Sequence, residues 1–468
     1  MIVVHCFHQL EAAADWRDAI DALNLASDRP DPFSTYAFYA HVLRQPALFP
    51  PGARLWLLLA CDENGVLRGC LPLRLREQRV LGRRSQRLDL LTAEVSDRPR
   101  LLLRPGDEQS VSIAMFDYLL SRRREWTLLE FQQQDADSAL RPPATMLHQC
   151  RQRHWPNAAN GNIAIRWPSL AGYYAALSKK FRSNLSRQLR QLLAAGEVEL
   201  LASSDPDTLP ALFALYCSVE SHGWKARTDA GFDHATQLGR HYHGLIAGDP
   251  PMALGIQLLL LDGQPIAGLI CAGFGSHCYA LHIVYDERLA RLAPGSAILF
   301  LGVRAAIAGG YRCFSLMWGY GYYKARWLAA MSDTRSFQFY RPFGGHDLRR
   351  RLGDLGRRWR PGAATAALSN PARDSLDRPE ATLPDQASAE YADPARRERH
   401  AALVRTVRVG RGEFLDAAQL AALMPFETRL PPPPHPATRG AQPSAHVGHA
   451  DGSGVIAWPA AAGIDSGN

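Results

Sequence analysis

The feature that most constrains the fold is a strand–turn–strand pattern that occurs twice in the 468-residue chain. Residues 54–76 read RLWLLLACDENGVLRGCLPLRLR, and residues 253–275 read ALGIQLLLLDGQPIAGLICAGFG. Each copy has two apolar runs joined by a short turn containing Asp and Gly, in which glycine supplies the positive φ that a tight reversal needs. The sequence therefore predicts two β-hairpins in distant parts of the chain.

Helical segments precede both hairpins in the same order. They cover residues 11–25 and 33–44 in the first half, and residues 209–221 and 236–246 in the second. The chain is also too long for one hydrophobic core, so the repeated order predicts two copies of one α/β (α+β) fold in tandem. We expect an N-terminal domain over residues 1–155 and a C-terminal domain over residues 156–360, each a mixed, twisted sheet flanked by helices.

The composition changes from about residue 361 onward. This part is rich in Ala, Pro, Arg and Asp and includes LPPPPHPATRGAQPSAHVGHADGSG. Such a stretch cannot bury enough apolar surface to offset its conformational entropy. We expect residues 361–468 to be a mostly disordered tail, with one weak helix over residues 414–424.

Charge and cysteine usage narrow the classes of function. The net charge of +8 mildly favours an anionic partner, but there is no dense basic tail or zinc-finger spacing, so DNA is not expected as a partner. Eight cysteines occur without a C-x-x-C pair, which predicts no metal site and a reducing compartment. No signal-peptide pattern and no apolar run long enough to span a membrane are found, and the expected location is the cytoplasm.

Residues 178–200, SKKFRSNLSRQLRQLLAAGEVEL, predict an amphipathic helix followed by a strand. The apolar stripe is formed by Phe181, Leu185, Leu189 and Leu192. The basic residues lie elsewhere around the helix. They fit either a solvated surface or a site for an acidic or phosphorylated substrate such as a nucleotide sugar, for which Arg182 and Arg187 are the candidates.

A candidate anion site follows the second hairpin. Residues 279–285 alternate like a strand and residues 297–308 are apolar at helical spacing. The sequence APGSA lies between them, so free N–H groups at a helix N-terminus could hold a phosphate, with Gly295 permitting close approach and Arg291 adding a charge. A plain β–α turn also favours Pro and Gly. The candidate cofactor-binding residues are Arg291, Pro294, Gly295, Ser296 and Ala297.

The next strand leads into LMWGYGYYKARW at residues 316–327, where aromatic residues surround Lys324. In an open α/β sheet, ligands bind at the carboxyl edge of the strands. The stretch is therefore a candidate pocket wall holding one positioned cation. The alternative is an aromatic loop that packs against a core.

Several of these stretches resemble the GNAT acyltransferases, in which a strand, a pyrophosphate loop, a helix and a strand hold acyl-coenzyme A. More particularly, they resemble the CelD-like acetyltransferase group, which is named after a cellulose-biosynthesis protein, and this resemblance covers roughly residues 16–343. It is carried by KKFRSNLSRQLRQL, VESHGWKA, DGQPIAG, YDERLARLAPGSAIL and GYYKARW. The chain also resembles, more distantly, the FemAB-type aminoacyltransferases, which use aminoacyl-tRNA.

The loop departs from the common GNAT pattern. That pattern reads Gln/Arg-x-x-Gly-x-Gly/Ala, whereas here Arg291 precedes Gly295 by four positions. The first hairpin is followed by RSQRLDLLTAEVSD, which has no glycine at a helix start. We expect only the C-terminal domain to hold a cofactor, which the resemblance implies is acetyl-CoA or another acyl-CoA.

Acyl transfer needs a base for the nucleophile, stabilisation of the oxyanion and a proton for the leaving thiolate. Lys324 is the candidate for oxyanion stabilisation. Tyr323 is the candidate proton donor by resemblance, although strand-like alternation would place Tyr322 on the same side as Lys324.

The stretch VESHGWKA, residues 219–226, supplies further candidates. Glu220 is the candidate base, because partial burial by Trp224 would raise the pKa of its carboxyl group. Alternatively, Glu220 pairs locally with Lys225. Tyr322, Trp224 and Lys225 are candidate substrate-binding residues. Asp286 is expected to hold Arg291 rather than to act on the substrate, and His282 is expected to be a core histidine rather than a base.

These observations predict an acyltransferase that moves an acyl group, with acetyl expected, from acyl-CoA to an amine or hydroxyl of a saccharide or cell-envelope precursor. One alternative is a FemAB-like ligase that uses aminoacyl-tRNA, in which case tRNA would be a partner. Another is a non-catalytic GNAT-like module that binds components of polysaccharide synthesis.

Overall fold

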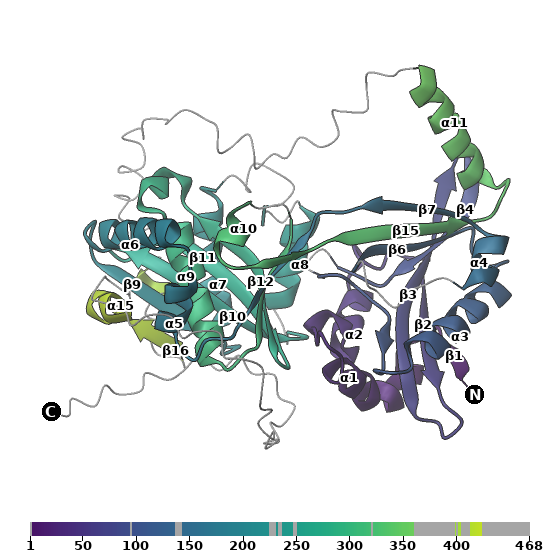
Figure 1. Cartoon of the computed structure of the whole chain (residues 1–468), viewed down its shortest axis with the longest axis horizontal. Coiled ribbons are helices and arrows are strands. Elements are labelled where there is room, and N and C mark those ends of the chain that lie inside the picture. The colour runs from purple at the N-terminus through teal and green to yellow at the C-terminus, as the bar shows by residue number, and fades with distance from the viewer. Residues whose placement is uncertain are drawn as a thin grey trace. The chain divides into compact units, whose positions relative to one another are not determined.

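The computed structural model describes residues 2–93, 96–135, 143–223, 231–232, 236–246, 250–319, 322–359, 398, 401–403 and 412–423 (Figure 1). The chain divides into two compact units. The first unit comprises Met1–Gly161, Trp318–Gly321 and Met331–Ala381, and the second comprises Asn162–Met317, Tyr322–Ala330 and Thr382–Asn468. Neither unit is a single continuous piece of chain.

The first unit is built on one mixed sheet. Its strands, in spatial order, are β1 (Val3–Phe7), β2 (Arg54–Cys61), β3 (Leu67–Val80), β4 (Arg83–Leu90), β6 (Leu128–Asp135), β15 (Thr334–Tyr340) and β7 (Arg151–Pro156), with β5 (Leu102–Leu103) paired to β3. The hairpin predicted over residues 54–76 is the antiparallel pair β2–β3. Strands β4 and β6 are parallel.

The second unit is built on another mixed sheet. Its strands, in spatial order, are β14 (Ala330–Ser332), β8 (Asn160–Ala164), β13 (Cys313–Trp318), β12 (His277–Tyr285), β11 (Gln264–Phe274), β10 (Ala253–Leu261), β9 (Val198–Ser203) and β16 (Gly412–Leu415). The hairpin predicted over residues 253–275 is the antiparallel pair β10–β11. Strands β12 and β13 are parallel.

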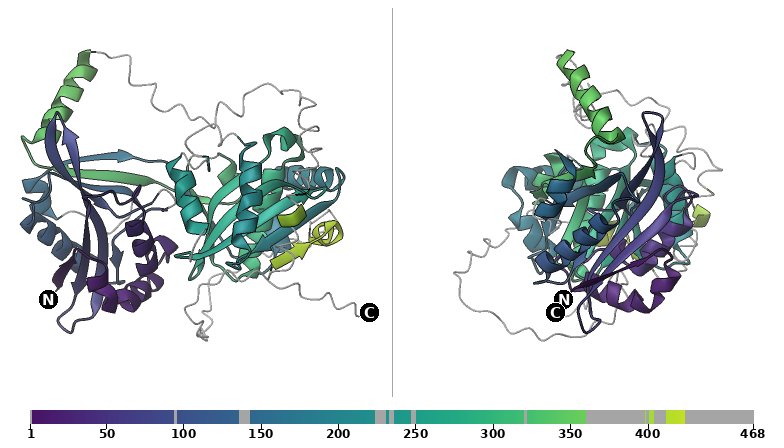
Figure 2. Two further views of the ribbon diagram at one scale, coloured as in Figure 1. Left: turned by 180° about the vertical axis from the view of Figure 1, so that it is seen from behind. Right: turned by 90° about the vertical axis from the view of Figure 1, so that its right-hand side faces the viewer.

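The two sheets repeat one topology, as the duplicated pattern predicts. In each, three consecutive antiparallel strands are followed by a helix and then by a strand parallel to the third. The helix is α3 (Glu108–Ser121) in the first unit and α9 (Pro294–Ala308) in the second. The fold is therefore mixed α/β, with two sheets flanked by helices (Figure 2).

The predicted helices lie close to their expected bounds. In the first unit they are η1 (Glu11–Trp16) with α1 (Arg17–Leu25), and η2 (Pro32–Ser34) with α2 (Tyr36–Arg44); α4 (Ala144–Gln149) and α11 (Gly345–Trp359) complete it. In the second unit they are α6 (Lys179–Leu193), α7 (Leu209–Glu220) and α8 (Gln237–Ile246), joined by α5 (Leu170–Ala176), η4 (Glu287–Leu292) and α10 (Tyr322–Arg326).

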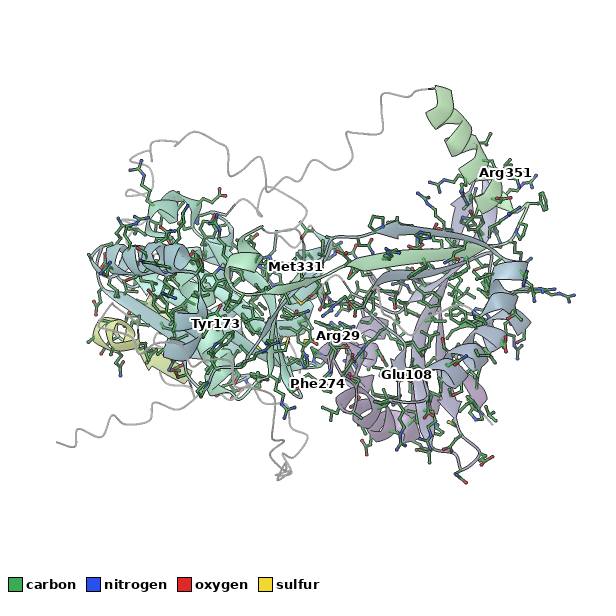
Figure 3. The ribbon with its side chains drawn as sticks, in the orientation of Figure 1. Arg29, Glu108, Tyr173, Phe274, Met331 and Arg351 are labelled. Atoms are coloured by element: carbon green, nitrogen blue, oxygen red, sulfur yellow. The ribbon has the colours of Figure 1, made fainter. Side chains whose placement is uncertain are left out.

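The hydrophobic core of the second unit explains why these segments are helical. Residues Ala297 to Val303 of helix α9 are all buried. Their burial explains why the sequence of this helix is apolar on all sides. Helix α6 has the predicted stripe, with Leu185, Leu189 and Leu192 buried at helical spacing. Tyr173 of α5, labelled in Figure 3, is fully buried beside them.

Strand β15 completes the first sheet although it follows the second unit in sequence. The sequence places residues 331–360 with the C-terminal domain, but β15 pairs antiparallel with both β6 and β7. Phe339 of β15 packs edge to face against Phe116 and Phe131, with ring centroids 6.1 and 6.3 Å away. Conversely, β8 belongs to the second sheet, where it lies beside β13. This is the same position that β15 takes beside β6 in the first sheet. The two halves of the chain thus exchange equivalent strands.

Part of the tail adds to the second sheet. The helix expected over residues 414–424 is present as α15 (Ala417–Leu423), but the preceding strand β16 was not predicted. β16 pairs antiparallel with β9, from Gly412 opposite Ser203 to Leu415 opposite Leu200. Leu420 is buried in the core of the second unit, so this segment covers an edge strand that would otherwise be open to pairing.

Candidate functional site

The candidate site lies where β12 and β13 separate. These parallel strands pair only from His277 opposite Cys313 to Tyr279 opposite Ser315, although β12 continues to Tyr285. Beyond Tyr279, β13 no longer pairs with β12. An extended ligand arm that carries amide groups can bind such a strand as another strand would.

A β-bulge occurs in β12 at the same place. Ile270 of β11 pairs with His282, whereas the next residue, Cys271, pairs with Ala280, so Leu281 is an extra residue. Bulges bend a strand and are common beside active sites, where they redirect main-chain groups and side chains. The bulge therefore lies next to the point at which the two strands diverge.

The turn after β12 differs from prediction in its ion pair. Asp286 caps η4 by accepting a hydrogen bond from the Arg288 amide at 2.9 Å. Its carboxylate also binds the Arg288 guanidinium, with Nη2 to Oδ2 at 2.7 Å. The expectation that Asp286 holds Arg291 is therefore wrong, because the tight 3₁₀ turn brings the guanidinium two residues away onto the carboxylate. Arg291 is exposed and forms no ion pair within the described residues.

The first turn of α9 offers fewer free amides than expected. Ala293 is left-handed (φ 51°), and its carbonyl accepts from the amides of Ser296 at 3.0 Å and Ala297 at 3.2 Å. Pro294 has no N–H. Of the first-turn amides, only that of Gly295 has no acceptor within the described residues. The predicted anion site is thus reduced to this N–H, the positive end of the helix dipole and the nearby Arg291.

Gly295 is needed for packing as well. A Cβ at this position would lie 2.8 Å from Cδ1 of Tyr285, the last residue of β12. Burial raises the pKa of the Tyr285 hydroxyl. The glycine therefore brings the start of α9 directly against the carboxyl end of β12.

Lys324 lies at the carboxyl end of β13, as the sequence predicts. It belongs to α10 and is buried, with 3% of its surface exposed. Its Nζ donates to the carbonyl of Met317 at 2.8 Å, and Met317 is left-handed with a φ of 59°. The ammonium is held in place by the turn that ends β13. A fixed cation in a region of low dielectric interacts strongly with developing negative charge.

The two tyrosines beside Lys324 are in a helix, so strand-like alternation does not apply to them. Tyr322 begins α10, and its side chain lies outside the described part of the chain. Tyr323 exposes 46% of its surface, yet desolvation raises the pKa of its hydroxyl. The hydroxyl is therefore protonated at neutral pH, as a proton donor must be.

Glu220 lies at the end of α7 and is buried, with 4% exposed. Gly223 closes the helix by donating to the Glu220 carbonyl at 2.9 Å, and a Cβ on Gly223 would lie 3.5 Å from the Tyr285 carbonyl. The ends of α7 and β12 and the start of α9 therefore meet around Tyr285. Trp224 and Lys225 lie outside the described residues.

A polar pair that the sequence analysis missed lies beside Glu220. The hydroxyl of Tyr216 is 2.8 Å from Nδ1 of His282, and Phe232 stacks on the histidine ring with centroids 4.3 Å apart. His282 is buried, as expected of a core histidine. Tyr216 and Glu220 are four residues apart on α7, and this helical spacing is the signal that could have linked them.

Arg182 and Arg187, the two candidate substrate-binding residues of α6, form contacts within the protein. Arg182 donates to the carbonyls of Ala175 at 2.5 Å and Leu177 at 2.7 Å, and so caps the end of α5. Arg187 is exposed and bonds to Asn184 and Gln191 of its own helix. Their contacts favour the structural alternative over substrate binding.

Neither a metal cluster nor a membrane-spanning helix is found in the described ranges. No group of three or more His, Cys, Asp or Glu side chains could hold a metal ion there. Likewise, no helix among those residues is long and apolar enough to cross a membrane.

The matched family agrees with this geometry. Residues 179–325 match the sequence profile of the family described as "Acetyltransferase (GNAT) domain". The chain carries a GNAT acetyltransferase domain. The match begins at α6 and ends within α10, so it includes the diverging strands, the start of α9 and Lys324. The protein is thus an acyltransferase of the GNAT type, and the GNAT domain implies acyl-CoA as co-substrate.

Solved structures with a similar fold include FemX, with a TM-score of 0.49 at 10% identity over 72% of this chain and 98% of FemX. A tandem GNAT protein from the clavulanic acid biosynthesis pathway has a TM-score of 0.40 at 13% identity over 73% and 98%. L-PGS from Bacillus licheniformis has a TM-score of 0.40 at 11% identity over 66% and 90%. No curated protein matches the sequence.

Proposed function

We propose that the second unit transfers an acetyl group from acetyl-CoA to an amine or hydroxyl of a saccharide or cell-envelope precursor in the cytoplasm. The observation that carries the transfer is the separation of β12 from β13 beyond Tyr279, directly beside the start of α9. The stretches that resemble the CelD-like group support a saccharide acceptor, as in cellulose or exopolysaccharide biosynthesis.

The start of α9 is suited to the diphosphate of the co-substrate. The Gly295 N–H can donate to a phosphate oxygen, and the exposed guanidinium of Arg291 adds a full positive charge nearby. The part of β12 beyond its pairing with β13 can bind the amide-containing arm in an extended form. The thioester would then lie near the bulge at Leu281.

The chemical step requires a base for the acceptor, a positive charge beside the carbonyl oxygen and a proton donor for the leaving thiolate. The acceptor nitrogen or oxygen attacks the thioester carbonyl carbon as its proton passes to the carboxylate of Glu220, which lies buried at the end of α7. The buried ammonium of Lys324 stabilises negative charge on the carbonyl oxygen. As the carbon–sulfur bond breaks, the thiolate takes the Tyr323 hydroxyl proton. Glu220 then releases its proton to solvent and Tyr323 takes one back from solvent, which restores both groups for the next turnover.

Thermal unfolding with acetyl-CoA tests this proposal. At a hundredfold excess over its dissociation constant, the ligand should add about 2.7 kcal/mol to the free energy of unfolding. Gly295→Ala should weaken this effect, because its Cβ would displace the Tyr285 ring 2.8 Å away. Gly172→Ala is the matched control, since its nearest neighbour would be 3.5 Å away, an ordinary contact.

Two outcomes would contradict the proposal. Absence of stabilisation by any acyl-CoA would favour a FemAB-like ligase if aminoacyl-tRNA binds with strong salt dependence, or a non-catalytic module if it does not. If acetyl-CoA stabilises the protein but no saccharide or amine acceptor is acetylated, the proposed co-substrate stands and the proposed class of acceptor is wrong.

A further inference from the structure

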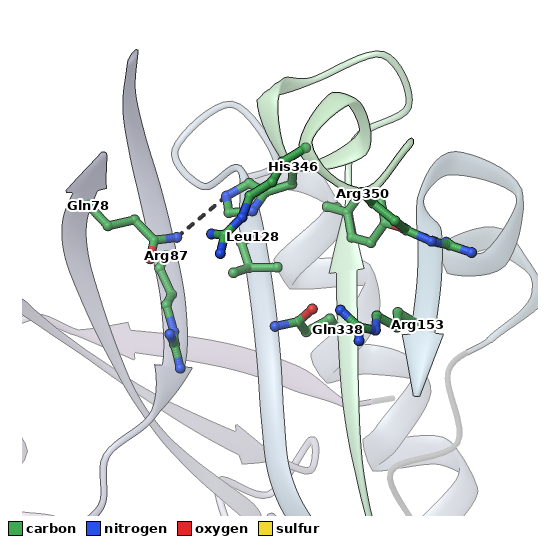
Figure 4. A pocket seen from close by; sticks show the side chains of 9 residues that line it. Gln78, Arg87, Leu128, Arg153, Gln338, His346 and Arg350 are labelled. Carbon is green, nitrogen blue, oxygen red and sulfur yellow. Dashed lines mark hydrogen bonds between the residues drawn. The ribbon is translucent and has the colours of Figure 1, made fainter. Parts of the chain in front are cut away.

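The first unit contains a cavity of about 320 Å³ that plays no part in the proposed transfer (Figure 4). It lies over the sheet strands β3, β4, β6, β15 and β7 and under the start of α11. The residues that line it are Gln78, Arg87, Leu128, Arg153, Gln338, Tyr340, His346, Arg349 and Arg350.

The strand register explains why this wall is polar. Arg87 is opposite Leu128, Leu128 is opposite Tyr340, and Gln338 is opposite Arg153, so these side chains share one face of the sheet. Alternate residues on the same strands point to the other face, where Leu129 and Phe339 join the apolar core. One sheet thus has a hydrophobic face and a cationic face.

The cavity has more positive than negative charge. Arg87 is compensated, because its guanidinium lies 3.2 Å from Asp89 and 3.1 Å from Glu130. Arg153 and Arg349 have no carboxylate within 4.0 Å in the described part of the chain. Arg153 instead lies over the ring of Trp155, 5.3 Å from its centroid.

The remaining polar groups are held in place around these two guanidiniums. His346 Nε2 lies 2.8 Å from Ser85 Oγ and 3.4 Å from Gln78 Nε2, the latter contact drawn as a dashed line in Figure 4. Arg350 donates to the Tyr340 hydroxyl at 2.6 Å, and Gln338 donates to Glu130 at 2.9 Å. The wall is therefore organised before any ligand enters.

We propose that this cavity binds the phosphate or diphosphate group of a small phosphorylated ligand. Guanidinium groups match phosphate oxygens with pairs of parallel hydrogen bonds, and several cations favour an anion of more than one charge over a single carboxylate. The volume is at the lower end of the range for small-molecule sites and exceeds what one phosphate fills. This site is separate from the acyl-CoA site of the proposed function and does not depend on it.

Calorimetric titration of the full-length protein with inorganic diphosphate tests the proposal. The double variant Arg153→Glu/Arg349→Glu should weaken binding at least tenfold, because it replaces both uncompensated cations with anions. Both residues are exposed, so the fold should persist, which circular dichroism and thermal unfolding check. Arg84→Glu is the matched control: it lies on β4 with 79% of its side chain exposed and does not line the cavity, so binding should change less than twofold.

Any of the following results of the titration would overturn the proposal. No heat with wild-type protein, unchanged binding in the double variant, or an equal loss in Arg84→Glu would each reject a specific site. The acetyl-CoA stabilisation must also survive in the double variant. Its loss there would mean that the cavity takes the phosphates of CoA itself, and there would be no separate site.

Two further probes identify the source of the phosphate. A nucleoside diphosphate in solution and vesicles containing phosphatidic acid present the same group in soluble and membrane-bound form. Binding of the soluble probe that the double variant abolishes assigns a free metabolite. Binding to vesicles alone, again abolished by the double variant, assigns a lipid headgroup.

Discussion

At the scale of single residues, Lys324 serves a structural and a proposed chemical purpose with one ammonium group. Its hydrogen bond to the Met317 carbonyl at 2.8 Å fixes the turn after β13 and also fixes the position of the charge. A hydrogen bond that involves a charged group contributes about 1.5–3 kcal/mol to stability. Removing the charge should therefore affect both unfolding and turnover.

The variant Lys324→Met separates these effects, because methionine keeps most of the side-chain volume. We expect the free energy of unfolding to fall by about 2 kcal/mol and kcat to fall about 100-fold or more, with little change in the KM for acetyl-CoA. Steady-state kinetics below the melting temperature measure the second effect. Arg326→Met, on the same helix but exposed, is the control. Full turnover in Lys324→Met would restrict Lys324 to its structural bond.

His41 should make the stability of the first unit depend on pH. Desolvation, followed by the charge of Arg44, lowers the pKa of His41 from 6.5 to about 4. The unfolded chain therefore binds a proton that the folded protein does not, so stability present above about pH 6.5 is lost as the pH falls toward 4. The shift corresponds to about 3 kcal/mol.

Denaturant unfolding between pH 7 and pH 4 measures this loss. His41→Gln should flatten the pH dependence, whatever its effect on absolute stability, whereas His5→Gln, at an exposed position, should leave the dependence unchanged. His346, whose pKa is also lowered by burial, contributes a residual slope in the same direction. An equal slope in His41→Gln and the wild type would contradict the assignment.

At the scale of elements, β15 should stabilise the first unit rather than the second. Phe339 is buried among Phe116 and Phe131, so Phe339→Ala should cost about 3–5 kcal/mol. Phe343→Ala, four residues later with 83% exposed, should change stability by less than about 0.5 kcal/mol. Hydrogen exchange locates the effect: protection should fall in β6 and β7 and persist in β10 and β11.

Strand β16, which is part of the C-terminal tail, offers a second test. Glu413 of β16 is buried and accepts from Arg304 of α9 at 2.7 Å. Removing one member of a buried ion pair strands the other charge, so Glu413→Ala should cost about 3 kcal/mol. A double-mutant cycle with Arg304→Ala should give clear coupling, whereas the exposed pair Arg84–Glu77 at 3.4 Å should couple by less than about 1 kcal/mol. Equal coupling in both pairs would show that burial does not matter here.

The elements that the sequence predicts are those with local signals. Both hairpins have turn residues and alternating apolar residues within the same short segment, and α6 has its stripe and its Ser178 cap. Strand β15 has a strand-like sequence, but its partners β6 and β7 are far away in the chain, so no local pattern reveals which sheet it joins. The same holds for β16, whose apolar contacts come from elements far away in sequence.

The order of elements predicts where Lys324 lies, whereas the hydrogen bonds around the candidate site were not predicted, and the roles of its residues stay predictions. Burial of Lys324 at the end of β13 follows from the order of elements. Asp286 binds Arg288 and not Arg291 because of a single 3₁₀ turn. Two amides in the first turn of α9 are not free because Ala293 is left-handed and its carbonyl accepts from them. Such details are set by backbone angles that composition and spacing do not specify.

At the scale of the whole molecule, the strand exchange means that the first unit cannot be cut out as one segment. Residues 1–161 alone lack β15 and leave one edge each of β6 and β7 unpaired, so this fragment should aggregate or remain partly unfolded. Joining residues 331–359 to it through a flexible linker should restore a monomer with dispersed NMR signals. A well-folded monomer of residues 1–161 alone would contradict the role given to β15.

The exchanged strand also sets a waiting time during synthesis. About 180 residues separate the end of the first segment of the first unit, Gly161, from the end of β15 at Tyr340. A ribosome that adds about 5–20 residues per second needs roughly 10–40 s to make them. For that interval the nascent chain has β6 and β7 without the strand that belongs between them. Chaperones that shield sheet edges should therefore be found on ribosomes that have passed the β7 codons and have not yet reached the β15 codons.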